Sequence, residues 1–241
     1  MNPTRLRTLT PLVALVATLI SASGLRAQVG HAPEDSPYRD IQRGSFFVAT
    51  LGTFRGSGGK LGVAPHDGHT YGLRWSILAN RPLQIGFGVT YGRLQHLVQN
   101  QSLTPDVRTT GPVETEVIWT DVALQINLTG GKTWHGIAPY FGAGLGLALT
   151  SEAPDEPTDF RMGNKFYFAP MAGTRIFLAS RLHLQVEGRY QFWQITYPES
   201  FRIPPFGGNG NDAVLPGGSL KEWSVTPWLQ VGLGYALSLP F

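Results

Sequence analysis

The chain of 241 residues contains no cysteine, so disulfides cannot hold its fold together and no cysteine is available for lipid attachment. Charge is also scarce, at 15% of residues, with 19 Lys and Arg against 16 Asp and Glu. Three of the arginines, Arg5, Arg7 and Arg26, lie in the first 27 residues, which contain no acidic residue. Beyond that segment the two signs balance, so we expect no nucleic-acid partner.

The sequence also has little that could form a membrane-spanning helix. The apolar segment 9–20 is about 12 residues long, whereas a spanning helix needs roughly 20. Basic residues precede this segment, and small residues at 21–24 and Ala27 follow it. This pattern predicts a signal peptide over 1–27 that is cleaved after export across the inner membrane, with an anchoring helix as the less favoured alternative. Residues 28–43 are polar, with Pro33 and Pro37, and we expect a disordered periplasmic lead-in there.

From residue 44 onward the side chains alternate with period two, which places successive residues on opposite faces of a strand. In 83–92, for example, Leu83, Ile85 and Phe87 alternate with Gln84, Gly86 and Gly88. The pattern predicts eight strands, near 44–54, 69–79, 83–93, 116–128, 137–149, 165–178, 182–194 and 223–241. The connections alternate between long (55–68, 94–115, 150–164, 195–222) and short (80–82, 129–136, 179–181). Long external loops and short periplasmic turns are typical of transmembrane barrels.

The second face of these strands indicates a membrane barrel rather than a soluble one. It is rich in glycine, at positions 86, 88, 92, 142, 144, 146, 173, 232 and 234. Glycine leaves room inside a narrow barrel for long side chains from other strands. The long inward residues would be Arg74, Trp119, Asp121, Gln125, Arg175, Glu187, Arg189 and Trp228. Charged groups are costly in the apolar core of a soluble barrel but are tolerated in a membrane barrel if they pair.

We therefore predict an all-β fold, an eight-stranded antiparallel up-and-down transmembrane β-barrel over 44–241 in a bacterial outer membrane. Interfacial aromatic girdles would include Trp75, Tyr91, Trp134, Tyr190 and Phe241. The first strand has two apolar faces, Phe46 and Val48 or Phe47, Ala49 and Leu51, and the pattern does not decide which one faces the lipid.

Two segments resemble a known superfamily. Residues 138–147, Ala-Pro-Tyr-Phe-Gly-Ala-Gly-Leu-Gly-Leu, resemble a strand of the small bacterial outer-membrane β-barrels, the OmpA/OmpX/OmpW-like proteins. The end of the chain resembles the C-terminal assembly signal of that group, with Tyr235, Leu237, Leu239 and Phe241 at alternate positions. The resemblance implies recognition by the barrel-assembly machinery, although Pro240 departs from the pattern.

The inward charges Arg74, Asp121, Arg175, Glu187 and Arg189 are the main candidate site. They could form an ion path or gate, or a salt-bridged plug that holds the barrel shut. We favour the plug because the lumen of an eight-stranded barrel is nearly filled by side chains.

Two loop segments are weaker candidates. His66-Asp67-Gly68-His69 could bind a metal, but it lacks further ligands at defined spacing, and a solvated turn is favoured. Residues 207–215 match a single calcium-binding nonapeptide, whereas such sites need stacked repeats, so we expect a flexible loop. No metal and no cofactor is expected.

None of the six histidines is followed two residues later by serine, the pair found in lipid A deacylases of this superfamily. The sequence thus favours a non-enzymatic barrel with a structural or surface-interaction role, in contact with outer-membrane lipid and lipopolysaccharide. A narrow channel or transporter for small, including hydrophobic, molecules is the alternative. A lipid A-modifying enzyme carries less weight, and the sequence does not indicate which partner the external loops contact.

Overall fold

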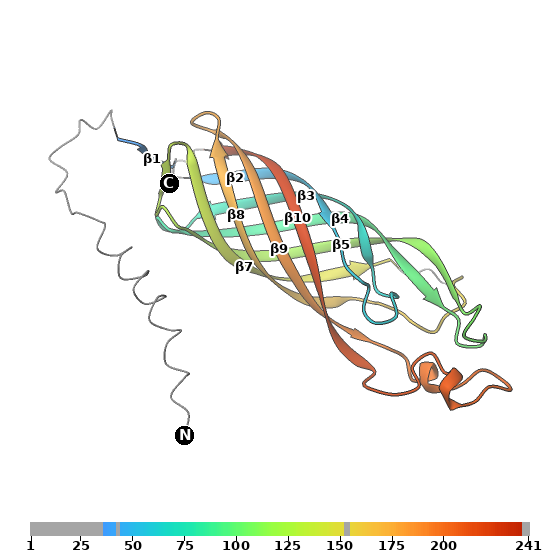
Figure 1. Ribbon diagram of the computed structural model, residues 1–241. Helices are drawn as coiled ribbons and strands as arrows, with labels where there is room; N and C mark the ends of the chain where they lie inside the picture. Colours follow the sequence, from blue (N-terminus) through green and yellow to red (C-terminus); the bar gives the residue numbers. More distant parts are fainter. Residues whose placement is uncertain (1–35, 42–43, 152–154, 238–241) are drawn as a thin grey trace, which may run out of the picture. The chain divides into compact units, whose positions relative to one another are not determined.

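A computed structural model describes residues 36–41, 44–151 and 155–237, and it forms a closed barrel of eight long strands (Figure 1). The strands are β2 (Ser45–Phe54), β3 (His66–Leu78), β4 (Leu83–Gln99), β5 (Thr109–Asn127), β7 (Ile137–Thr150), β8 (Lys165–Phe177), β9 (Leu182–Thr196) and β10 (Lys221–Leu237). Each is antiparallel to the next, and β10 pairs with β2 from Trp228↔Phe54 to Leu237↔Ser45. The predicted eight-stranded antiparallel barrel is confirmed.

One predicted loop is wrong. The segment 94–115 was expected to be a long irregular loop, but β4 continues to Gln99 and β5 begins at Thr109. The two strands form a hairpin that projects beyond the rest of the wall (Figure 1). Alternation continues there, but the outward positions carry polar residues such as Arg93 and Gln95, which conceals the strand pattern.

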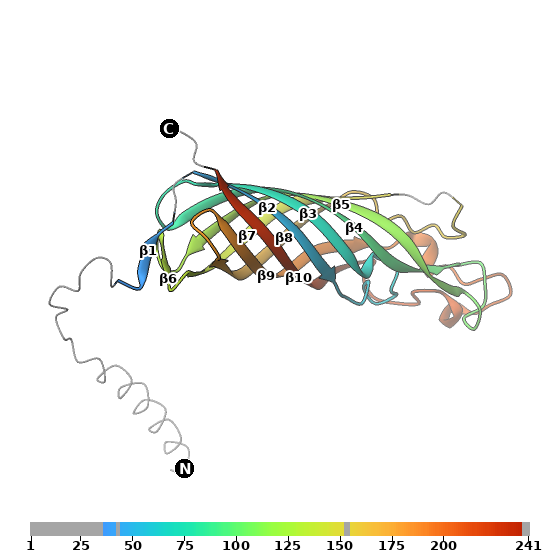
Figure 2. The same cartoon turned by 90° about the horizontal axis from the view of Figure 1, so that it is seen from above.

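A short additional pair of strands lies at the end of the barrel with the short turns (Figure 2). Strand β1 (Tyr38–Asp40) pairs with β6 (Lys132–Trp134), from Tyr38↔Trp134 to Asp40↔Lys132. Residues 38–40 belong to the segment expected to be disordered, and β6 lies within the expected turn 129–136, so both expectations differ from the structure. The predicted signal peptide, Leu239 and Phe241 lie outside the described residues.

Apolar side chains cover the outside of the wall. Outward residues such as Leu73, Leu124 and Leu229 have exposed fractions of 67%, 52% and 54%. In water, the hydrophobic effect would place these side chains in the interior. Their outward position therefore suits a barrel that is surrounded by hydrocarbon. The structure also decides the facing of β2: Phe46 and Val48 point into the barrel, whereas Phe47, Ala49 and Leu51 point outward.

The expected aromatic girdle forms partly as predicted. Near the short-turn end, Trp75 stacks between Phe47 and Phe87, with ring centroids 6.4 and 5.8 Å away. Tyr91 and Tyr190 lie in mid-strand rather than at strand ends, because β4 and β9 continue past them. On β4, Tyr91 is the last outward residue before the polar Arg93 and Gln95, and so it marks the loop-side limit of the apolar band.

The irregular part of the structure lies at the opposite end of the barrel. Two short 3-10 turns, η2 (Glu199–Arg202) and η3 (Gly210–Asp212), lie in the loop between β9 and β10. No helix within the described residues is long and apolar enough to cross a membrane.

Candidate functional site

A ring of four charged side chains crosses the barrel interior. Arg74 on β3 donates to both carboxylate oxygens of Asp121 on β5, at 2.9 and 3.0 Å. Arg189 on β9 binds Asp121 at 2.9 Å and Glu187 at 2.5 Å, and Arg74 lies 3.6 Å from Glu187. Each of the four is at most 6% exposed. Two cations and two anions therefore alternate in a neutral, desolvated layer, and each charge has opposite charges on both sides.

The fifth predicted residue joins this layer indirectly. Arg175 lies diagonally from Glu187 in the β8–β9 register, but it makes no ion pair within 4.0 Å in the described part of the chain. Its guanidinium binds Asn127 and Gln125, at 2.7 and 2.5 Å, and lies 4.2 Å from the ring centroid of Tyr140. Gln125 in turn donates to Glu187 at 3.0 Å, so Arg175 is connected to the ring through neutral side chains.

A glycine on β4 makes the first ion pair possible. In the wall, Gly88 lies between Arg74 on β3 and Asp121 on β5. A Cβ atom at this position would be 2.9 Å from Oδ1 of Asp121 and 3.0 Å from Nη2 of Arg74. Residues two strands apart can therefore meet only because β4 carries no side chain there.

Two tyrosines complete the layer. Tyr140 donates to Glu187 at 2.6 Å, and Tyr167 donates to Asp121 at 3.2 Å. They come from β7 and β8, so five strands contribute to the layer. Neither tyrosine was among the site residues predicted from the sequence, although each lies on the inward face that alternation assigns to its strand. The signal in the sequence that could have found them is a tyrosine at an inward position of a strand, since its buried hydroxyl needs a hydrogen-bond partner.

An aromatic layer fills the barrel on the loop side of the charges. The ring of Phe54 lies 5.3, 5.9 and 5.7 Å from those of Trp119, Trp193 and Trp228. All four are at most 1% exposed. Loop residues continue this cluster above the wall: Phe160, Met162, Tyr197, Phe201, Val214 and Leu215. The loop-side mouth is therefore covered by apolar packing.

A third closure lies at the short-turn end. The imidazole of His183 is fully buried between Phe46 and Phe177, whose ring centroids are 5.8 and 5.2 Å away. Ile41 and Ala236 pack beside Phe46. Aromatic, ionic and apolar layers thus follow one another along the interior, and together they fill it.

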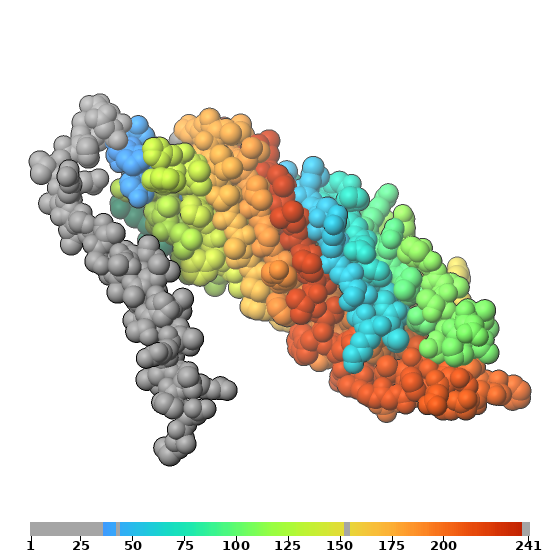
Figure 3. Space-filling view, viewed as in Figure 1, coloured from blue at the N-terminus to red at the C-terminus, as the bar shows by residue number. Residues whose placement is uncertain are grey.

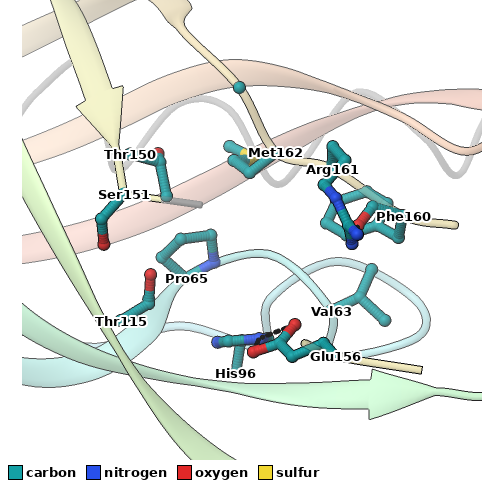
Figure 4. Close-up of a pocket in the computed structure, with 11 residues that line it drawn as sticks. Val63, Pro65, His96, Thr115, Thr150, Ser151, Glu156, Phe160, Arg161 and Met162 are labelled. Carbon is teal, nitrogen blue, oxygen red and sulfur yellow. Dashed lines mark hydrogen bonds and ion pairs between the residues drawn. The ribbon is translucent and has the colours of Figure 1, made fainter. Parts of the chain in front are cut away.

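A small pocket lies in the mouth, where two loops meet the wall (Figure 4). His96 Nε2 lies 3.1 Å from a carboxylate oxygen of Glu156, and the pocket also includes Thr115 and Ser151. Its volume of about 30 Å³ accommodates roughly one water molecule. The Ser151 hydroxyl donates to the backbone carbonyl of Glu116, at 3.1 Å, so it is not arranged as a nucleophile activated by His96.

The first of the two weaker candidates, 66–69, was predicted to be a solvated turn, but it forms the start of β3. His66 Nδ1 lies 2.9 Å from the carbonyl of Ala64, and His69 is exposed on the outer face of β3. No group of three or more potential metal ligands gathers within the described residues. In 207–215, the Asp212 carboxylate accepts from the backbone N–H of Asn209 at 2.8 Å in a capping box, and Arg108 binds the Asp212 carbonyl at 3.0 Å.

Solved structures share this architecture. The outer membrane protein OprG from Pseudomonas aeruginosa is 13% identical, with a TM-score of 0.52 over 85% of this chain and 100% of that chain. The chain has the fold of the small bacterial outer-membrane β-barrels. Neisserial surface protein A is similar at 13% identity and a TM-score of 0.46, covering 84% of this chain and 98% of that one. No family model matches the sequence, and no curated protein matches it significantly.

The position of the ionic layer within the barrel decides what the layer can do. All five predicted charges are buried among side chains from neighbouring strands, and Arg74, Asp121, Glu187 and Arg189 contact one another directly. Each of the five side chains is at most 6% exposed. The layer can fix the relative positions of β3, β5 and β9, which do not neighbour one another in the wall.

Proposed function

We propose that the protein is a non-enzymatic, non-conducting barrel of the bacterial outer membrane that presents its loop cluster at the cell surface. The observation that carries this proposal is the filled interior, closed by the ionic ring, by the aromatic layer around Phe54 and by the packing around His183. An ion crossing the barrel would have to separate all three layers.

The loop end supports a role at the surface. The loops pack into an ordered cap: Leu215 donates its N–H to the carbonyl of Phe201 at 2.7 Å, and Arg108 from the β4–β5 hairpin binds the β9–β10 loop. At the tip of that loop, Phe206 is fully exposed. An ordered cap with an exposed aromatic residue suits contact with lipopolysaccharide or an outside partner.

The same proposal includes assembly of the barrel through a signal at the end of the chain. The predicted assembly signal includes Tyr235 and Leu237, which lie on the outward face of β10 with exposed fractions of 45% and 39%. Their recognition by the barrel-assembly machinery, and cleavage of the signal peptide, stay predictions.

The test is ion conductance of the folded protein in planar lipid bilayers. We expect insertion without steady conductance. Insertion is checked independently by heat-modifiable mobility in gels. Inserted protein that shows no steady ion conductance therefore supports the proposal. A steady conductance that is abolished by Gly144→Trp would overturn it in favour of the channel alternative, because Gly144 faces the lumen beside Met171.

A further inference from the structure

A groove on the outside of the wall lies where three neighbouring strands carry small or imino residues. Its outward lining from these strands, β8, β9 and β10, includes Pro170, Ala172, Gly188, Tyr190, Pro227 and Leu229, and Thr53 of β2 borders it. Its volume is about 740 Å³. The wall of β8, β9 and β10 faces the viewer in Figure 3, in amber, orange and red.

The groove has a cause in the strand pairing. Between β8 and β9 the register runs from Phe168↔Phe192 directly to Met171↔Arg189, so the ladder is interrupted at Pro170. Proline has no N–H to donate, and the neighbouring Gly188 has no side chain to fill the space. A Cβ atom at Gly188 would meet no atom within 4 Å.

The cationic side chain of Arg55 lies at the rim of this groove. Arg55 lines it, is exposed, and has no ion-pair partner within 4.0 Å in the part of the chain that the structure describes. No carboxylate lines the groove, and its other cation, Arg189, is committed to the buried ionic ring. Arg55 also borders a polar hollow over β2, β3, β4 and β5, which contains His69 and Arg93 as well as Asp67 and Glu114.

The height of Arg55 along the wall matches a lipid headgroup. It follows the last residue of β2, whose 10 residues begin at the short-turn end. Ten residues at about 3.3 Å each, tilted by about 40°, rise about 25 Å, which is roughly the height of the apolar band of such barrels. The guanidinium therefore lies at the loop-side boundary, with the groove in the apolar region below it.

We propose that this groove binds an acyl chain of lipid A, the phosphorylated glycolipid of lipopolysaccharide, with Arg55 binding a lipid A phosphate. The inference rests on the proposed function in one respect, namely that the loops face outward, because that orientation places the groove in the lipopolysaccharide leaflet. The apolar lining takes the chain, and the planar guanidinium forms paired hydrogen bonds with phosphate oxygens.

The experiment measures lipid A that remains bound to full-length protein extracted from lipopolysaccharide-containing vesicles, quantified by mass spectrometry. Gly188→Phe fills the groove without an internal clash, and Arg55→Gln removes the cation. Arg55→Gln is expected to lower bound lipid A about tenfold, the loss that corresponds to one charge-assisted contact. Gly188→Phe is expected to lower it by at least as much, because the new ring occupies the space of the acyl chain. Matched controls are Ala49→Phe, at an outward position of β2, and Arg81→Gln, at a short turn.

The retained lipid shows whether lipid A binds in the groove. Unchanged binding in both groove variants, or equal loss in the controls, overturns the inference. Vesicles with phosphatidylglycerol and no lipopolysaccharide form a second arm, and equally tight, groove-dependent retention of that lipid overturns the assignment to lipid A. Dephosphorylated lipid A should bind wild type as weakly as intact lipid A binds Arg55→Gln. Conductance is measured on the same samples, so a conducting barrel that still binds lipid A contradicts only the proposed function.

Discussion

A buried carboxylate in this barrel holds two guanidinium groups at once. Asp121 contacts both Arg74 and Arg189 at 2.9 Å, and Tyr167 also donates to it. Replacing it with asparagine removes the charge, keeps the size, and leaves two buried cations short of an anion. We expect Asp121→Asn to lower the free energy of unfolding by about 3–5 kcal/mol, measured by urea unfolding in lipid vesicles.

The control for this variant is an exposed pair on the outer face. Arg93 and Glu116 lie 3.9 Å apart with side chains 68% and 56% exposed. Glu116→Gln should change stability by less than about 1 kcal/mol. If the two variants cost the same, the ionic ring does not hold the strands together.

Outward residues at mid-height face hydrocarbon, which predicts a cost for charge there. Leu124→Arg should destabilise the barrel by about 2–4 kcal/mol, whereas Gln95→Arg, beyond Tyr91 on the projecting hairpin, should cost about 0–1 kcal/mol. Folding into vesicles, followed by tryptophan fluorescence, gives both values. Equal costs would mean that the apolar band has been placed at the wrong height.

At the residue scale the sequence predicted which side chains are inside, but not all of their partners. Alternation put Arg74, Asp121, Glu187 and Arg189 on inward faces. It could not show that Arg175 binds Gln125 and Asn127, because that choice depends on how far each strand is staggered around the barrel.

Among the elements, the loop between β2 and β3 is tied to the last strand. Glu222 on β10 accepts from the backbone N–H of Lys60 at 2.7 Å and from the hydroxyl of Tyr197. Burial and this hydrogen bond raise the pKa of Tyr197, so the phenol remains a donor to a higher pH than an exposed tyrosine would.

Removing this acceptor should loosen the loop. In Glu222→Ala the backbone of Lys60 loses its partner, and trypsin cleavage after Lys60 should accelerate roughly fivefold, the effect of about 1 kcal/mol on local opening. Glu199→Ala, an exposed acid of the same loop cluster, is the control. Unchanged cleavage in both variants would show that other contacts hold the loop.

Strand existence was easier to predict than strand length. The membrane-embedded parts show apolar alternation because one face meets lipid. Above the lipid both faces meet protein or water, so β4 and β5 continue as far as Gln99 and Thr109 without an apolar signal. The pairing of β1 with β6 was missed because three residues are too few to show a period.

For the whole molecule, eight strands and their up-and-down order followed from alternation and loop lengths. The three filled layers did not, because packing among eight strands depends on stagger and on loops that fold back over the mouth. The prediction of a plugged interior came from barrel size alone, and it is the conductance experiment that tests it.

The seam between β2 and β10 makes assembly all-or-none. It joins Ser45 to Leu237 and Phe54 to Trp228, so the wall has two open edges until the last strand is in place. In lipid each unpaired backbone group on such an edge costs several kcal/mol. A chain that ends before Lys221 therefore cannot persist in the bilayer as a smaller version of this protein. Any premature stop before the final strand removes the whole barrel, however much of the chain has been made.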